Sequence, residues 1–171
     1  KKYGAVLIFD EISSGFRLTT GGAHLTLGVE PDIAVFSKAL SNGYPMAAII
    51  GKSEVMEAVE NSFISSTYWT DRIGPTAALA TINKHKNSFV SDHLDKTGNS
   101  IQEIWKVTSN KYGLDIEVSG INPMSYFKFT NDPSLIMMTF YIQEMMKFKI
   151  LSSNRFYANF AHQDKHIERY N

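Results

Sequence analysis

Two charged residues follow apolar runs at points where a cofactor or metal ion could bind. Ala5–Phe9 is an unbroken apolar run, and it ends in Asp10. Ligands bind beyond the carboxyl ends of strands in open α/β sheets. Asp10 could therefore hold magnesium in a P-loop ATPase, or keep a pyridinium nitrogen protonated so that the ring accepts electrons. An ordinary strand-end acid that caps the next turn is the third interpretation, and the residues around Asp10 leave all three open.

Lys38 is the second candidate, because it also follows a predicted strand, over residues 31–37. An isolated lysine is normally a solvated surface residue. Here Phe36, Ala39 and Leu40 surround it, and apolar neighbours favour the uncharged amine that attacks an aldehyde. The turn that contains Gly43 and Pro45 would hold the backbone after Lys38.

A stretch rich in hydroxyl groups is the third candidate. Ser65–Thr70 precedes a helix that we expect to begin near Pro75, since proline suits the first helical turn. Hydroxyls and backbone N–H groups ahead of a helix could bind phosphate. A loop that only caps the helix is the alternative.

The elements that would position these residues are strands and helices in alternation. The run at residues 5–9 predicts a strand buried on both faces, as in a parallel sheet. We expect further strands over 31–37 and 46–50, and a helix capped by Ser53. The pattern from residue 1 to about residue 91 is thus α/β.

The second part of the chain reads differently. We expect a long polar helix over residues 88–111, antiparallel strands over 114–118 and 125–129, and a Met-rich helix from Asp132-Pro133 to about Lys147. The buried stripe predicted for the long helix consists of Phe89, Leu94, Ile101, Ile104 and Trp105.

Composition excludes several classes of function. Seventeen basic residues balance seventeen acidic ones, so the charge indicates neither nucleic acid nor an anionic membrane as a partner. The absence of cysteine excludes disulfides, thiolate metal sites and a cysteine nucleophile, and no metal site is predicted. No apolar run approaches the roughly 20 residues of a membrane span, and no secretory signal is visible, so we expect a cytoplasmic protein. Because the chain opens at Lys1 without an initiator methionine, we expect a piece of a larger protein, clipped at both ends.

The motifs, in this order and spacing, resemble the class III pyridoxal-phosphate-dependent aminotransferases, a fold-type I group that includes glutamate-1-semialdehyde aminomutase. The resemblance covers roughly residues 4–83. It is carried by Leu-Ile-Phe-Asp-Glu-Ile-Ser-Ser-Gly-Phe-Arg (residues 7–17), Pro31-Asp32-Ile33, the run from Ser37 to Pro45, and the stretch ending in Gly74-Pro75. Phe16-Arg17 and the run from residue 28 to 32 favour the aminomutase-like branch.

The resemblance implies a role for each matching residue. Lys38 would form a Schiff base with pyridoxal 5'-phosphate and later move the substrate proton. Asp10 would pair with the pyridine nitrogen, and Ile12 would pack against one face of the ring. Ser13 stands where many members have a glutamine that bonds the phenolic oxygen. Thr70 would reach the cofactor phosphate of a neighbouring subunit, with Thr67 as the fallback.

The implied fold is part of a fold-type I large domain over residues 1–91, a mostly parallel sheet flanked by helices. A smaller, incomplete α+β C-terminal domain would follow over residues 92–171. The implied reaction is transamination, or aminomutase-type intramolecular amino transfer, between a small-molecule amino donor and a carbonyl acceptor. Racemase or decarboxylase chemistry would use Lys38 and Asp10 equally. A homodimer with the active site at its interface is expected, and the isolated chain is expected to be poorly active.

Two alternatives stay open on the residues. The chain could be a non-catalytic fragment or assembly module that retains the fold. A piece of a P-loop ATPase would need a Gly-x-x-x-x-Gly-Lys-Ser/Thr loop, which the sequence does not contain. No arginine can be assigned to a substrate carboxylate from its position.

Overall fold

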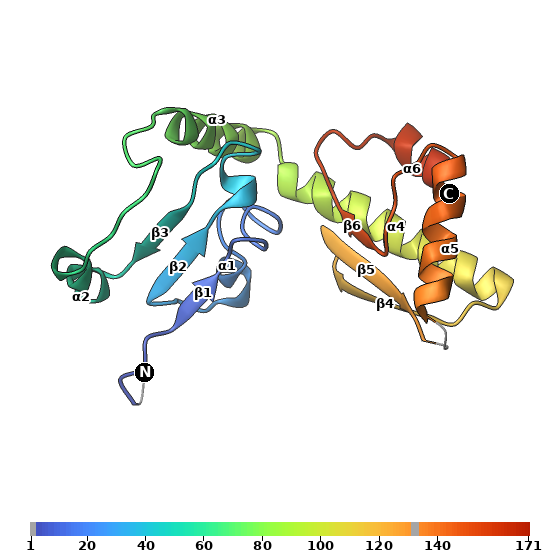
Figure 1. Ribbon diagram of the computed structural model, residues 1–171, viewed down its shortest axis with the longest axis horizontal. Helices are drawn as coiled ribbons and strands as arrows, with labels where there is room; N and C mark the ends of the chain where they lie inside the picture. The colour runs from blue at the N-terminus through green and yellow to red at the C-terminus, as the bar shows by residue number, and fades with distance from the viewer. Residues whose placement is uncertain (1–2, 131–133) are drawn as a thin grey trace. The chain divides into compact units, whose positions relative to one another are not determined.

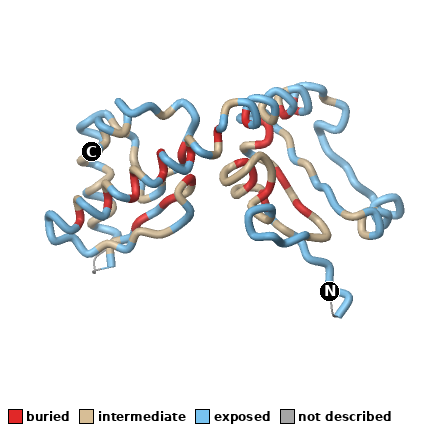
Figure 2. The backbone as a smooth tube through the Cα atoms, turned by 180° about the vertical axis from the view of Figure 1, so that it is seen from behind, coloured by how far each residue is buried: buried red, intermediate tan, exposed pale blue. Residues whose placement is uncertain are grey.

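The computed structural model describes residues 3–130 and 134–171. The chain divides into two compact units, Lys1–Ser91 and Asp92–Asn171. Figure 1 labels the helices and strands of each unit, and Figure 2 marks the buried segments.

The first unit is built on a sheet of three strands in the order β1-β2-β3. β1 (Ile8–Asp10) pairs in parallel with β2 (Ile33–Phe36), so that Asp10 lies opposite Val35. β3 (Ala48–Gly51) pairs antiparallel with β2. The strands predicted over 31–37 and 46–50 are therefore present, and the last of them runs against the other two.

Helices of the first unit are short except for one. They are α1 (His24–Leu27), the 3-10 helix η1 (Lys38–Leu40), α2 (Ser53–Met56), the 3-10 helix η2 (Glu57–Asn61) and α3 (Ile73–Asn87). Pro75 lies in the first turn of α3, as expected. Ser53 is the first helical residue of α2 rather than its cap, because Lys52 occupies the capping position and no side-chain capping bond forms.

The core of the first unit joins α3 and η1 to the sheet. It consists of Phe16, Ala34, Phe36, Leu40 and Ala78. The expectation that the first strand is buried on both faces is wrong for the described residues, since Val6, Leu7 and Ile8 are 49%, 38% and 56% exposed. The reason is that β1 is an edge strand bonded only to β2. Its apolar side chains remain on the surface of this unit.

The second unit packs helices on an antiparallel sheet. Its elements are α4 (Val90–Tyr112), which begins just before the unit boundary, β4 (Ile116–Ile121), β5 (Met124–Phe129), α5 (Ser134–Lys147), β6 (Arg155–Tyr157) and α6 (Asp164–Tyr170). β5 pairs antiparallel with both β4 and β6. The predicted hairpin is confirmed, and the turn lies at Asn122-Pro123. Asp132-Pro133, the predicted start of the Met-rich helix, lies outside the described residues.

The buried stripe of α4 agrees with the prediction at all but one position. Leu94, Ile101 and Trp105 are buried, and Ile104 is half-buried. Phe89 is 75% exposed, which corrects its assignment to the core. It precedes the helix with a left-handed φ of 49°, so its side chain leaves the helical periodicity. Val90 is buried instead. Among the residues that the structure describes, no helix is long and apolar enough to cross a membrane.

Gly98 lies where α4 packs against the β4–β5 turn. A Cβ atom at this position would lie 1.7 Å from the carbonyl oxygen of Asn122. The turn is held there by a bond from Asn122 Nδ2 to Asp95 Oδ1 of 3.0 Å. Backbone atoms cannot yield as a flexible side chain does, so α4 and the turn would have to separate.

We therefore expect Gly98→Ala to destabilise the second unit by roughly 3 kcal/mol, the upper range for overpacking. Urea unfolding followed by Trp105 fluorescence, with Trp69 replaced by Phe, measures this loss. Asn99→Ala, at an exposed position of the same helix, is the control and should be nearly neutral. An unchanged midpoint in Gly98→Ala would contradict the close contact.

Candidate active site

The sheet places Asp10 and Lys38 at one edge. Asp10 is the last residue of β1, and Lys38 follows the end of β2 at Phe36. Because β1 and β2 are adjacent and parallel, both residues stand beyond the carboxyl ends of neighbouring strands. Open α/β sheets bind ligands at such an edge.

Lys38 has an unusual backbone conformation. Its φ is 49°, in the left-handed region that non-glycine residues seldom occupy. The surrounding bonds hold it there: Asn42 N–H donates to the Lys38 carbonyl at 3.1 Å, and Ser37 Oγ donates to the Met46 carbonyl at 2.8 Å. Such conformations persist only where the neighbouring structure fixes them, and they cluster at functional sites.

The Lys38 side chain points away from the core. Phe36 and Leu40 are buried, whereas Lys38 is exposed, and its Nζ donates to Ser13 Oγ at 2.5 Å. The expectation that apolar neighbours desolvate Lys38 is therefore wrong for the described residues. Strand alternation and the η1 turn send those neighbours into the core and the amine to the opposite side. What the chain does supply is a hydroxyl that orients the amine.

Asp10 is exposed at the end of β1, and one of its carboxylate oxygens caps the turn that follows. Oδ1 accepts a bond from the backbone N–H of Ile12 at 3.0 Å. This is the turn-capping role expected of an ordinary strand-end acid, and it also fixes the direction of the carboxylate. Ile12 and Ser13 are half-buried on the same turn. The four predicted residues Asp10, Ile12, Ser13 and Lys38 are thus brought together.

Thr70 is not brought to the other predicted residues. It lies in an exposed loop, as do the other residues of Ser65–Thr70. Asp71, and not Thr70, caps the first turn of α3: its Oδ1 accepts a hydrogen bond from the N–H of Ile73 at 2.8 Å. Within residues 3–130 and 134–171, Thr70 makes no hydrogen bond to Asp10, Ser13 or Lys38.

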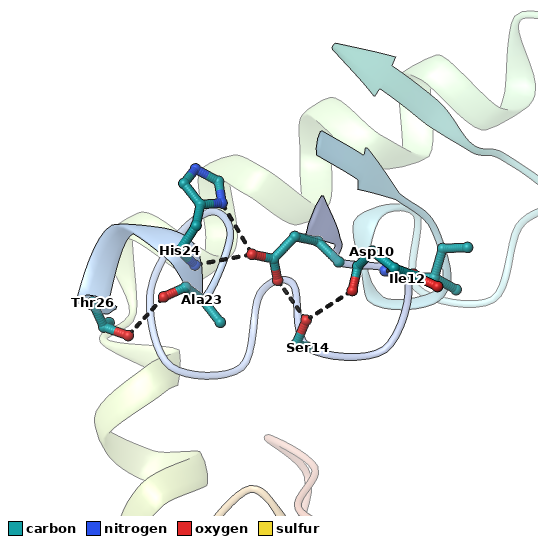
Figure 3. A network of polar contacts seen from close by, with 7 residues as sticks. Asp10, Ile12, Ser14, Ala23, His24 and Thr26 are labelled. Carbon is teal, nitrogen blue, oxygen red and sulfur yellow. Dashed lines mark hydrogen bonds and ion pairs between the residues drawn. The ribbon is translucent and has the colours of Figure 1, made fainter. Parts of the chain in front are cut away.

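Glu11, next to Asp10, is a buried carboxylate to which the sequence motifs assign no role. Glu11 is 1% exposed. Its Oε1 accepts from both the backbone N–H and the Nδ1 of His24, each at 2.9 Å, and its Oε2 accepts from Ser14 Oγ. Figure 3 shows this network, which ties the turn after β1 to the start of α1. The sequence signal for this contact is Gly22, since glycine allows close approach to a buried group.

The network keeps Glu11 ionised. Burial raises the pKa of its carboxyl, but the bonds from Ser14, from the N–H groups of His24 and Ala23, and from the His24 ring together hold the pKa below its ordinary value of 4.5. A fixed negative charge therefore lies directly beside Asp10 in sequence.

His85 of α3 holds the far side of the same loop. It is 6% exposed; its Nε2 donates to the Phe16 carbonyl at 3.0 Å, and its Nδ1 lies 2.8 Å from Thr20 Oγ1. When the ring is neutral with its proton on Nε2, Thr20 is the donor to Nδ1. Phe16 has a φ of 58° and is buried, so the bond supports a second strained residue near the site.

His85 should make the stability of the first unit depend on pH. Burial lowers the pKa of its imidazole below the ordinary 6.5, and the bond to the Phe16 carbonyl offsets only part of this. Unfolded His85 thus takes up a proton at a higher pH than folded His85. The stabilisation is complete above about pH 6.5 and is lost as the pH falls through the folded pKa. Urea midpoints measured by circular dichroism between pH 7.5 and 5 should fall less in His85→Gln than in the wild type; parallel curves would contradict this.

The functional groups at this edge of the sheet match part of what pyridoxal phosphate needs. The aldehyde of this cofactor needs an amine, and its pyridine nitrogen needs a carboxylate. Its phenolic oxygen needs a hydrogen-bond donor. Lys38, Asp10 and Ser13 are groups of these kinds on one edge of the sheet. A phosphate needs several donors, and the predicted residues offer Thr70 for it, with Thr67 as the fallback.

Comparison with known proteins identifies the family. Residues 1–134 match the family model of the class-III aminotransferases, and the chain belongs to this family. The resemblance recognised in the motifs is therefore confirmed.

Relatives include both transaminases and aminomutases. The chain is 38% identical over 133 residues to 3-aminobutyryl-CoA aminotransferase of Cloacimonas acidaminovorans, covering 77% of this chain and 32% of that protein. It is 30% identical over 186 aligned positions to glutamate-1-semialdehyde 2,1-aminomutase of Thermodesulfovibrio yellowstonii, covering 99% and 44%. The chain thus spans less than half the length of these relatives.

Solved structures agree on the fold. The internal aldimine form of the Sphingopyxis sp. MTA144 FumI protein with pyridoxal phosphate has a TM-score of 0.92 at 22% identity, covering 98% of this chain and 41% of that one. An omega-transaminase from Sphaerobacter thermophilus has a TM-score of 0.87 at 20% identity, covering 99% and 43%. The predicted fold class, part of a fold-type I transaminase, is confirmed.

Proposed function

We propose that the protein carrying this chain transfers amino groups with pyridoxal 5'-phosphate, and that Lys38 forms the Schiff base with the cofactor. The observation that carries the proposal is the placement of Asp10 and Lys38 beyond the carboxyl ends of adjacent parallel strands, within the region that matches the family. We assign residues 1–91 to the cofactor-binding domain and residues 92–171 to a C-terminal small domain.

Each site residue has a task in this proposal. The bound cofactor supplies an electron sink for the pair of electrons left on the substrate carbon. Asp10 holds the proton on the pyridine nitrogen, and Ile12 packs against the ring. Lys38 would take the proton from the substrate carbon at Nζ and return it. Ser13 orients Nζ by the bond already present and serves the phenolic oxygen.

The remaining contacts require a second copy of the chain. Thr70 lies apart from Lys38 within the described residues, so we assign it to the cofactor phosphate of the partner in a cytoplasmic homodimer. Exposed apolar side chains on β1 and β3, among them Ile8 at 56%, Ile49 at 59% and Ile50 at 57%, leave ample surface for further packing.

The substrate is a small amino donor, with a carbonyl compound as acceptor. Relatives that transfer the amino group between molecules and relatives that move it within one molecule are about equally similar to the chain. Intramolecular transfer is therefore the second candidate function. A non-catalytic module would share the fold without Schiff-base formation, and a P-loop ATPase is disfavoured by the family match.

Isotope transfer separates these functions. The protein with added cofactor is supplied with ¹⁵N-labelled amino donors and unlabelled keto acids or aldehydes, and products are analysed by mass spectrometry. Label in the acceptor supports transamination. Isomerisation of glutamate-1-semialdehyde in the absence of an added acceptor supports the aminomutase. No label in any product, with cofactor bound, would contradict amino transfer and favour the non-catalytic module.

A further inference from the structure

Glu11 is a buried charge that the proposed chemistry does not use. Its carboxylate is 1% exposed, and burying a charge is costly unless bonds compensate it. Compensation is extensive here, with Ser14 on one oxygen and the N–H and ring of His24 on the other. Its own N–H donates to the Val35 carbonyl at 2.8 Å, which extends the β1–β2 pairing by one residue beyond Asp10.

The loop from residue 11 to residue 24 is built tightly around this carboxylate. A Cβ atom on Gly22 would lie 2.7 Å from Glu11 Oε1 and 2.3 Å from His24 Nδ1. On Gly15 it would lie 2.7 Å from the Glu11 carbonyl oxygen and 2.8 Å from a ring atom of Phe36. The two glycines leave room for the Glu11 backbone and side chain, and a side chain at either position would displace part of the loop.

The same loop carries Ile12 and Ser13, which the proposed function assigns to the cofactor. Ile12 N–H is bonded to Asp10, Ser13 Oγ to Lys38 and Ser14 Oγ to Glu11. Arg17 Nε also donates to the Ser13 carbonyl, at 3.1 Å. Because Ser13 and Ser14 are consecutive, a shift of Ser14 on loss of the Glu11 charge moves the hydroxyl that holds Lys38 Nζ.

We propose that Glu11 is a positioning residue. Its carboxylate, acting through Ser14 and His24, holds the loop so that the Asp10 carboxylate and the Ser13 hydroxyl stay aligned with the cofactor and with Lys38. This proposal rests on the proposed function, which assigns Asp10, Ser13 and Lys38 to the cofactor. The rigidity of the loop over residues 11–24 can nevertheless be measured without cofactor.

The first readout is hydrogen exchange of the cofactor-free protein. Glu11→Gln keeps the size of the side chain and removes the charge, and hydrogen bonds to charged groups are the stronger ones. We expect exchange in residues 11–24 to accelerate about tenfold or more, on the scale of one lost charged bond. Exchange in α3 should stay unchanged. Glu54→Gln, which removes an exposed acid on α2, is the matched control and should alter neither segment.

The second readout is a double-mutant cycle on cofactor retention. If Glu11 acts through the Asp10 loop, Asp10→Asn should weaken retention much less in a Glu11→Gln background than in the wild type. Independent effects multiply to within about twofold. Multiplicative losses, or faster exchange spread evenly over the first unit, would overturn the positioning role and leave a purely structural one.

A further variant, Ser14→Ala, tests the proposal even if the Glu11→Gln protein fails to fold. Ser14→Ala removes one partner of the same carboxylate and should give the same local pattern at smaller size; unchanged exchange in residues 11–24 would also overturn the proposal. Failure of the proposed function has a different signature. In that case Lys38→Ala would retain cofactor as the wild type does, whatever the exchange of the loop.

Discussion

Replacing Lys38 with alanine is expected to lower the rate of amino transfer by roughly a thousandfold or more, because one residue supplies both the covalent attachment and the mobile proton. The fold should survive, since Lys38 is exposed and its only described side-chain bond is the one to Ser13. Steady-state turnover of the variant with saturating cofactor measures the effect.

Two control variants distinguish Schiff-base formation by Lys38 from the effect of its positive charge. Lys38→Arg keeps a cation beside Ser13 but cannot form a Schiff base, so it should be as inactive as alanine. Lys86→Ala removes an exposed lysine from α3 and should keep full activity. Activity in Lys38→Arg above about a tenth of wild type would show that only the charge matters, and would remove Lys38 from the covalent role.

Asp10→Asn is expected to reduce turnover by about two to three orders of magnitude, since a neutral amide cannot hold the proton on the pyridine nitrogen. Asparagine keeps an oxygen that accepts the Ile12 N–H, so the turn is preserved. The measured loss therefore reports the charge rather than the backbone.

The chain provides a closely matched control for this substitution. Asp71 also caps a backbone N–H two residues ahead, that of Ile73 at 2.8 Å. Asp71→Asn should leave turnover near the wild-type value. Equal losses in the two variants would mean that turn capping, and not the pyridine nitrogen, explains Asp10.

Local sequence patterns predicted the structural features that depend on residues close together in the sequence. The strand-end positions of Asp10 and Lys38 follow from apolar runs, and the hairpin follows from the turn at Asn122-Pro123. Phe89 was placed wrongly because a helical stripe takes no account of a left-handed residue before the helix. The run at residues 5–9 was placed wrongly because burial depends on what covers a strand, which its own residues do not determine.

The candidate site was predictable only where its residues form a motif. Asp10, Ile12, Ser13 and Lys38 belong to such motifs and are brought together. Glu11 and His24 are separated by the loop, and whether that loop folds back onto the carboxylate is a tertiary property. The orientation of Lys38 could not be predicted either, because residues adjacent in sequence can point to the opposite side of the chain. Phe36 and Leu40 are buried, whereas Lys38 is exposed.

Reduction of the protein with borohydride in the presence of pyridoxal phosphate, followed by peptide mapping, tests whether Lys38 forms the Schiff base. We expect a cofactor adduct on the peptide that contains Lys38, abolished in Lys38→Ala and undiminished in Lys86→Ala. An adduct confined to other lysines, or one that persists in Lys38→Ala at the wild-type level, would contradict it.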